Sequence, residues 1–316
     1  MKVLIDADMI AHEVGHLRYN EKDEKGNDII DPDTGRVVKG DLFPLAQVVE
    51  IAKGRLLSIV MGSQAGGWRA FLTKGRHYRH DIATILPYKG HREGQDRNNV
   101  DHVKDSLHSD LGAQWETTRE ADDALATEMW NDLVTTGSEF GWDDESLRRH
   151  CNTVIASRDK DLDTVPGWKF SWWLKGAKDA DGVEIPEEKR VVEKGRGYWV
   201  SITQAFRNFY TQLLTGDAAD NIKGLYGIGP KSAWVKQVQE MGTDGESFED
   251  ALESEEEMYE HVLDKYLKHF GPNYGPKFLR ENAHLLHMQR RVDDEWLPPG
   301  ERDEHYWFLD PKRKED

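Results

Sequence analysis

Four short apolar runs alternate with segments of helical spacing in the first half of the chain, and this alternation limits the possible folds most. The runs are "KVLID" (2–6), "WRAFLT" (68–73), "NTVIAS" (152–157) and "WKFSWWL" (168–174). Apolar residues recur with a helical period between them, in 42–61, 98–111 and 120–134. Strands that alternate with helices in this way predict an α/β fold with a mostly parallel sheet.

The second part of the chain has a different pattern. From Ser201 onward helical periods continue almost throughout. We therefore expect two domains, an α/β domain over 1–200 and a helical region over 201–316. Two surface hairpins are predicted within the first domain, one over 20–40 around the turn "DPDTG" and one near 175–197.

Charge and composition narrow the class of protein. A single cysteine, Cys151, excludes an intrachain disulfide and suits a reducing compartment. No apolar stretch is long enough to span a membrane, so we expect a monomeric cytoplasmic protein without a membrane partner. The formal net charge of -17 argues against a nucleic-acid partner, but the charge is unevenly distributed. Acids dominate 244–260, whereas 74–92 is basic and could hold a polyanion.

Acidic residues gather in four places that could support chemistry. They are Asp6 at a strand end, Glu120, Asp122 and Asp123 in "EADDALA", Asp159 and Asp161 in "SRDKDLD", and Asp217 and Asp220 in "TGDAADN". Each cluster alone has a simpler explanation, because acids are favoured in the first turn of a helix, in tight turns and at helix caps. Asp6 and the pair Asp159 and Asp161, however, follow apolar strands, and ligands of open α/β sheets bind at the carboxyl ends of strands.

Eight converging carboxylates would repel one another unless cations lay between them. Ligation by oxygen alone suits Mg²⁺ or Mn²⁺. Two such ions, about 3.5 to 4 Å apart, can activate a water molecule and stabilise the leaving oxygen of a phosphodiester. The acids therefore indicate nuclease chemistry.

Taken in order, "LIDAD", "PYKGHR", "EADDALA", "SRDKDLD" and "TGDAADNIKGLYGIGPKSA" resemble the motifs of the 5′-nuclease superfamily. That superfamily includes flap endonucleases, the 5′-nuclease domain of bacterial DNA polymerase I, and bacteriophage 5′→3′ exonucleases and primer-removing ribonucleases H. The resemblance implies a PIN-like, mostly parallel sheet flanked by helices. It also implies a helical arch near 74–110 and a helix-three-turn-helix motif in the C-terminal helical region.

The resemblance also implies roles for the acids and the basic loop. Asp6, Glu120, Asp122 and Asp123 would hold one Mg²⁺ or Mn²⁺, and Asp159, Asp161, Asp217 and Asp220 a second, some of them through water. Lys89 and Arg92 would contact the scissile phosphate and offset charge during catalysis, and Tyr88 would stack on a nucleobase. A solvated basic loop is the simpler alternative. Arg79 would touch DNA or pair with a surface acid.

The glycine-rich turn "GLYGIGPKSA" is similar to the superfamily's helix-three-turn-helix, which grips the backbone of duplex DNA, often with a bound K⁺. We expect Gly227, Gly229, Lys231 and Ser232 to contact nucleic acid there. Glycine lets the backbone approach closely, and N–H groups favour phosphate.

One position departs from the pattern: Thr73 stands where many members carry another acid, ahead of the arch. Asp8 is either an N-cap or an outer ligand. The sequence thus predicts a Mg²⁺-dependent 5′→3′ exonuclease or flap endonuclease acting on DNA with 5′ ends or flaps, in phage or bacterial replication or repair. Two alternatives remain open, a ribonuclease H that removes RNA primers from RNA–DNA hybrids and a non-catalytic nucleic-acid-binding scaffold.

Overall fold

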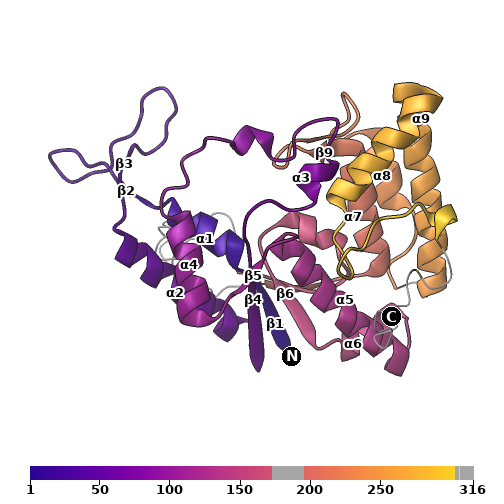
Figure 1. The fold of residues 1–316 in the computed structure, drawn as a ribbon, viewed down its shortest axis with the longest axis horizontal. Helices are drawn as coiled ribbons and strands as arrows, with labels where there is room; N and C mark the ends of the chain where they lie inside the picture. Colours follow the sequence, from indigo (N-terminus) through magenta and orange to yellow (C-terminus); the bar gives the residue numbers. More distant parts are fainter. Residues whose placement is uncertain (173–195, 246, 303–305, 307–316) are drawn as a thin grey trace.

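The computed structural model describes residues 1–172, 196–245, 247–302 and 306, and its centre is a six-stranded sheet (Figure 1). In sheet order the strands are β5 (Gln114–Glu116), β4 (Gly67–Thr73), β1 (Lys2–Asp6), β6 (Thr153–Ala156), β7 (Gly167–Ser171) and β8 (Arg196–Val200). All neighbouring strands run parallel except β7 and β8, which are antiparallel. The expected mostly parallel sheet is confirmed. The hairpin expected near 175–197 lies almost wholly outside the described residues.

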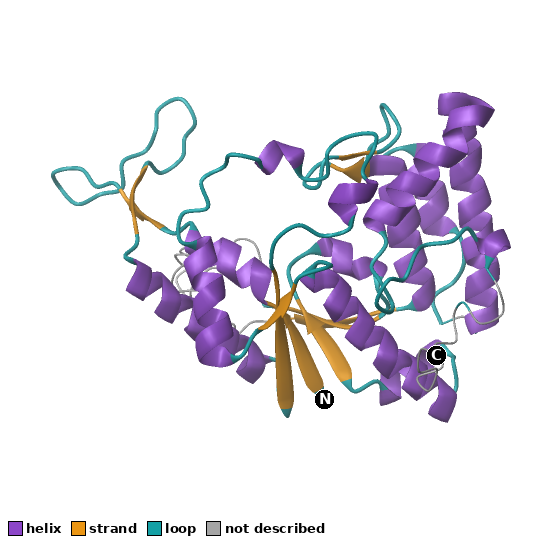
Figure 2. Cartoon of the chain, in the orientation of Figure 1, coloured by secondary structure: helices purple, strands orange, loops and turns teal. Residues whose placement is uncertain are grey.

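Helices cover both faces of the sheet, and each face has its own apolar core (Figure 2). Val3 and Ile5 of β1 point to one face and Leu4 to the other, as the alternation of a strand requires. The first face is covered by α1 (Ala7–Gly15), α2 (Leu45–Gly62) and α4 (Val100–Leu111). The second is covered by α5 (Ala121–Phe140), α6 (Asp144–His150) and the helical region.

The helical region packs against the second face of the sheet. It contains α7 (Ile202–Thr215), α8 (Ala233–Glu240) and the long α9 (Phe248–Leu286). Gly271, with a positive φ of 74°, interrupts α9 and is followed by Pro272, which has no N–H to continue a helix. The second half of α9 therefore changes direction. None of the helices among the described residues has an apolar stretch that could cross a membrane.

Two long segments follow strands of the sheet, one between α1 and α2 and the other between β4 and α4. A hairpin formed by β2 (Arg18–Asn20) and β3 (Lys39–Leu42) projects from the body, which confirms the first predicted hairpin (Figure 1). After β4, the chain forms the short helix α3 (Arg79–Ile82) and a 3-10 turn, Gly90–Arg92, before it crosses to α4. This crossing segment lies above the edge of the sheet where the acidic residues lie.

Candidate metal and phosphate site

Most of the predicted acids surround one pocket of about 120 Å³ at the carboxyl ends of the parallel strands. The pocket wall combines carboxylates with basic groups from the crossing segment. From the predicted set it includes Glu120, Asp122, Asp159, Asp161, Asp217 and Asp220, together with Arg79, Tyr88, Lys89 and Arg92. Segments more than 130 residues apart in the sequence thus meet at one place.

Asp6 lies beside this pocket at the end of β1. Its carboxylate is the N-cap of α1 and accepts hydrogen bonds from the Met9 amide at 3.0 Å and the Ser157 hydroxyl at 2.8 Å. Burial and the neighbouring carboxylates of Asp8 and Asp159 raise the pKa of Asp6 to about 7. Its charge therefore belongs to the same electrostatic cluster, although the side chain also holds the start of α1.

The N-terminus of α5 supplies the next carboxylates. Glu120 is the N-cap, and burial together with Asp6 and Asp159 raises the pKa of the Asp122 carboxyl well above its usual range. Glu120 behaves in the opposite way. Burial alone would raise its pKa, but contacts with Lys89, His77 and Arg79 hold the pKa well below the usual value.

The loop after β6 and the turn after α7 supply the remaining acids. Burial and the neighbouring carboxylates of Asp159 and Asp217 raise the pKa of Asp161 to about 8. Asp217 lies in β9 (Gly216–Asp217), and although burial opposes the shift, its side-chain hydrogen bond with Asp161 helps to lower the pKa of Asp217. Burial also raises the pKa of Asp159.

The turn that carries Asp217 and Asp220 has a tightly packed backbone. β9 pairs with β10 (Ile222–Lys223), and Gly216 adopts a φ of 71°. A Cβ atom on Gly216 would lie 2.2 Å from the amide nitrogen of Gly224, and a Cβ on Gly224 would lie 2.3 Å from that of Gly216. Only glycine fits at both positions.

The basic crossing segment is docked on this acidic turn. Lys89 donates from its amide to the Asp220 carbonyl at 3.0 Å, and Arg92 donates to the Ala219 carbonyl at 2.6 Å and to Asp220 Oδ1 at 3.0 Å. The Lys89 ammonium contacts the Glu120 carboxylate and lies 3.5 Å from Asp220 Oδ2. Lys89 also has a left-handed backbone with a φ of 53°, uncommon for a residue with a side chain.

Asp123 does not fit its predicted role as a metal ligand. It is fully buried, and its two carboxylate oxygens accept from Arg79 at 2.6 and 2.8 Å and from the amides of Glu120 and Gln289. Its side chain points into the protein interior, whereas that of Asp122, the preceding residue of α5, lines the pocket.

Arg79 and Tyr88 also differ from the DNA contacts expected of them. Arg79 is 1% exposed, pairs with Asp123 and donates to the carbonyls of Leu285 and His287. Arg79 therefore pairs with an acid, but with a buried one and not with the surface acid of the alternative interpretation. Tyr88 is 4% exposed, and its hydroxyl donates towards Glu120 and Asp220, so its ring is not available for a nucleobase to stack on.

Thr73 has a structural role in place of the missing acid. Its hydroxyl accepts a hydrogen bond from the Ala121 amide at 2.9 Å and so satisfies an N–H in the first turn of α5. Asp8 accepts from the Thr73 amide and pairs with Lys104 at 2.7 Å. The N-cap of α1 is Asp6, so the N-cap role considered for Asp8 is wrong.

The glycine-rich turn lies outside the pocket, between β10 and α8. Gly227 has a φ of 77°, Lys231 is exposed, and the Ser232 side chain caps α8 by accepting from the Val235 amide. Tyr226, which the sequence reasoning did not single out, is 89% exposed at this turn. The turn presents backbone and side-chain groups to solvent.

Sequence reasoning also missed three residues near the carboxylates. His77 lies 3.2 Å from Glu120, and Lys160 and Gln212 line the pocket. His77 and Lys160 lie in or beside segments that the motifs had marked, which was a usable signal. Gln212 lies on an amphipathic helix, and nothing in its sequence context distinguishes it.

The oxygen ligands around the pocket are of the type that a hard divalent cation prefers. A positive charge beside these buried carboxyls would also stabilise their ionised forms, which the fold disfavours by raising their pKa values. Among the described residues, no group of three or more Asp, Glu, His or Cys side chains is arranged so that it could hold a metal ion. Glu120 and Asp220 are instead held by Lys89, Arg92 and Tyr88. Cation binding would therefore require some of these side chains to rotate.

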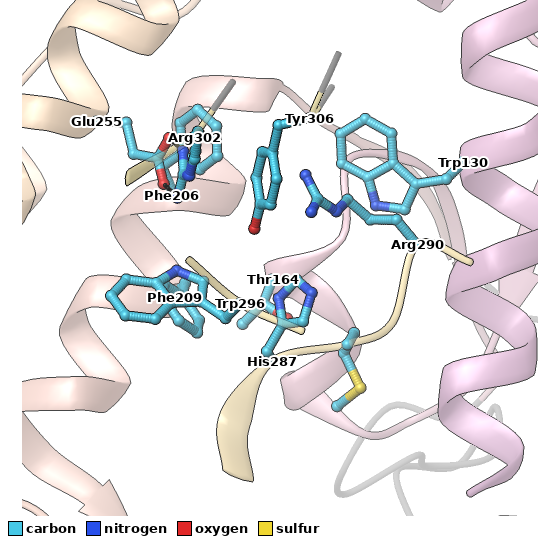
Figure 3. Close-up of a pocket in the computed structure, with 11 residues that line it drawn as sticks. Trp130, Thr164, Phe206, Phe209, Glu255, His287, Arg290, Trp296, Arg302 and Tyr306 are labelled. Carbon is cyan, nitrogen blue, oxygen red and sulfur yellow. Dashed lines mark hydrogen bonds and ion pairs between the residues drawn. The ribbon is translucent and has the colours of Figure 1, made fainter. Parts of the chain in front are cut away.

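A second cavity, between α5 and the helical region, is unrelated to these groups (Figure 3). Aromatic side chains that include Phe206, Phe209 and Trp296 line it, and none of the predicted site residues does. Arg302 pairs there with Glu255, and the Arg290 guanidinium stacks 4.0 Å from the ring of Tyr306. These contacts tie residues near the C-terminus to the helices.

No family model and no curated protein matches the sequence. Among solved structures, the chain aligns with the bacteriophage T5 D15 protein co-crystallised with metal ions, at 15% identity and a TM-score of 0.41, over 90% of this chain and 99% of the other. It also aligns with a substituted T5 D15 flap endonuclease described as a pseudo-enzyme–product complex with DNA and metal ions, at 15% identity, a TM-score of 0.44 and coverages of 90% and 98%.

A lysine-to-alanine mutant of the T5 5′-exonuclease aligns at 15% identity and a TM-score of 0.39, over 90% of this chain and 99% of the other. These proteins are of the kind that the sequence motifs resemble. The likeness is one of fold at low identity, and the assignment of chemistry depends on the residues of the pocket.

Proposed function

We propose that the protein is a Mg²⁺- or Mn²⁺-dependent, structure-selective nuclease that hydrolyses phosphodiesters of DNA at 5′ ends or flaps. The observation that carries the proposal is the meeting of three acidic segments and one basic segment at a single pocket, with Asp6 beside it. Neither group alone would indicate phosphodiester hydrolysis, since acids could cap helices and basic residues could solvate a loop. Together they provide for both a metal ion and a phosphate.

Six acids are the proposed metal-binding set: Asp6, Asp122, Asp159, Asp161, Asp217 and Asp220, with Glu120 joining them once Lys89 has moved. When bound, divalent ions would activate water and stabilise the leaving oxygen of the phosphodiester. The raised pKa values of Asp122 and Asp161 support this assignment, because the fold keeps those carboxyls close to one another at a cost that a cation would remove.

Lys89 and Arg92 are the proposed phosphate contacts. They lie on the same pocket wall as the acids, and Arg92 has a side chain that is 43% exposed. A guanidinium and an ammonium at this place would offset negative charge that develops on the phosphate in the transition state. Their present partners, Glu120 and Asp220, keep both cations beside the pocket.

The exposed turn at Gly227, Gly229 and Lys231 is the proposed contact with duplex DNA, with K⁺ as a candidate ion there. Ser232, at the end of this turn, caps the N-terminus of α8. Contacts of this kind reach the sugar-phosphate backbone and do not distinguish one base from another. Selectivity would therefore follow the shape of the substrate. A monomer that acts in replication or repair in the cytoplasm is the simplest setting.

The proposal can be tested with 5′-labelled duplex, 5′-flap and RNA–DNA hybrid substrates, each with Mg²⁺ or with chelator. Cleavage that requires Mg²⁺ and prefers the DNA flap or the duplex end is expected. Preference for the hybrid would make the protein a primer-removing ribonuclease H, and no cleavage with any divalent ion would favour the scaffold.

Asp161→Asn should abolish cleavage and leave DNA binding intact. Asp163→Asn is a matched control, because Asp163 is two residues away, accepts from the Tyr198 hydroxyl at 2.8 Å and does not line the pocket. Equal activity of the two variants would remove Asp161 from the proposed metal-binding set.

A further inference from the structure

Gln212 of α7 is a neutral side chain of the pocket wall that is hydrogen-bonded directly to a proposed metal-binding carboxylate. Its amide nitrogen donates to Asp161 Oδ1 at 2.5 Å. The side chain is 8% exposed and lines the pocket together with Asp159 and Asp217. None of the motifs includes Gln212.

The other end of the same amide lacks a partner. Gln212 Oε1 is buried and accepts no hydrogen bond from any of the described residues. A buried carbonyl without a donor has lost its hydrogen bonds to water without replacement, so such an atom calls for an explanation. A ligand of the pocket that donates hydrogen bonds or carries positive charge would supply one.

The orientation of the amide follows from the chemistry of its neighbour. Metal binding requires ionised carboxylates, and an ionised Asp161 can only accept hydrogen bonds. The amide nitrogen accordingly faces Asp161, and the carbonyl oxygen is the atom of this side chain that remains without a partner. A flipped amide would set two acceptors against each other.

We propose that Gln212 is a positioning residue for the divalent ion, holding Asp161 with its N–H group and accepting from the hydrated ion with its carbonyl oxygen. The inference rests on the proposed function, because it requires that a divalent ion binds in this pocket. Mg²⁺ and Mn²⁺ keep several water molecules when they bind to proteins, and these waters need acceptors. Residues that orient metal ligands in this way affect metal affinity strongly.

The test is a Mn²⁺ titration of the full chain, followed by the electron paramagnetic resonance signal of free Mn²⁺. Gln212→Met keeps the length of the side chain and removes both polar groups. We expect its Mn²⁺ affinity to be about 10- to 100-fold weaker than that of the wild type. Gln204→Met is the matched control, since Gln204 lies on the same helix, bonds to Asn208 and does not line the pocket.

The outcomes separate this inference from the proposed function. A wild type that binds no Mn²⁺ would overturn both. A wild type that binds Mn²⁺ with the same affinity as Gln212→Met would overturn the role of Gln212 alone, and the nuclease proposal would stand.

A second variant covers the case in which Gln212→Met does not fold. Gln212→Glu keeps an oxygen towards the pocket but places a carboxylate against Asp161. We expect a lower melting temperature without metal and a larger rise on addition of Mn²⁺ than the wild type shows. A rise no larger than that of the wild type would mean that this side chain does not face the ion.

Discussion

The ammonium group of Lys89 contacts the carboxylate of Glu120 and lies 3.5 Å from a carboxylate oxygen of Asp220. Although burial disfavours its charge, Glu120 and Asp220 raise the pKa of the Lys89 amine above its usual value. A protein side chain thus supplies positive charge among the carboxylates. The same lysine is a proposed contact of the scissile phosphate. It would therefore compete with a metal ion for the carboxylates and also bind the substrate.

Lys89→Met should therefore bind Mn²⁺ more tightly and cleave more slowly than the wild type. Removal of the ammonium takes away one of the cations that compete with a metal ion for Glu120 and Asp220, and we expect affinity to rise about tenfold. Single-turnover cleavage should fall because charge on the phosphate is no longer offset. Isothermal titration with Mn²⁺ and cleavage of a flap substrate measure the two effects.

Lys53→Met, on the surface of α2, is the control. Weaker Mn²⁺ binding by Lys89→Met would contradict the competition.

Asp122→Asn should stabilise the metal-free protein and weaken its response to metal. Burial and repulsion by Asp6 and Asp159 raise the pKa of Asp122, so the fold disfavours its ionised form, and the stability that depends on protonated Asp122 is lost as pH rises. The amide of asparagine does not ionise, so the variant does not lose this stability as pH rises. The melting temperature at about pH 8, with and without Mn²⁺, measures both effects.

Asp132→Asn is the control for that experiment, since Asp132 lies on the same helix but bonds to the Asn152 amide away from the pocket. A wild type that gains no stability from Mn²⁺ would contradict the expectation, and so would an Asp122→Asn protein that gains as much as the wild type.

Arg79→Met should destabilise the protein strongly whether or not metal is present. The arginine and Asp123 are both buried, and removal of one partner leaves the other charge uncompensated, at a cost of about 3–5 kcal/mol. Arg79→Lys should not rescue stability, because an ammonium cannot reproduce the two parallel hydrogen bonds. Urea unfolding measures the change. Arg76→Met is the matched control, because Arg76 forms an exposed pair with Asp81.

Lys169→Met should remove a pH dependence of stability. Burial lowers the pKa of the Lys169 amine from 10.5 to about 7. Above about pH 7 the folded protein holds a neutral amine while the unfolded chain still binds the proton, so stability rises with pH up to about 10.5. Below about pH 7 this contribution is absent. The slope is about 1.4 kcal/mol per pH unit.

Urea unfolding of the wild type and Lys169→Met at about pH 7 and about pH 9 measures that contribution. The free energy of unfolding of the wild type should rise with pH relative to that of the variant. A constant difference between the two proteins would show that the amine titrates at its ordinary pKa.

Sequence patterns predicted the sheet and most positions around the pocket, because strand ends and helix starts fix where a short acidic side chain can lie. They could not separate Asp122 from Asp123. Adjacent residues of a helix point about 100° apart, and which of them faces the pocket depends on how α5 packs. Arg79, the partner of Asp123, lies 44 residues away in sequence.

The role of Gln212 was beyond sequence reasoning for a similar reason. A single glutamine on an amphipathic helix has no spacing that marks it, and its importance depends on the distance to Asp161. Tyr88 shows the opposite error. The resemblance of "PYKGHR" to the superfamily's motif implied that Tyr88 stacks on a nucleobase, whereas its hydroxyl is hydrogen-bonded to Glu120 and Asp220.

The close approach of Gly216 and Gly224 leaves the two neighbouring aspartates vulnerable to changes that touch no charge. One methyl group at either glycine would force the β9–β10 hairpin apart and carry Asp217 and Asp220 with it. The crossing segment, anchored on Asp220, would shift in the same movement. Tolerance to mutation in this molecule is therefore set as much by two residues without side chains as by the acids they hold in place.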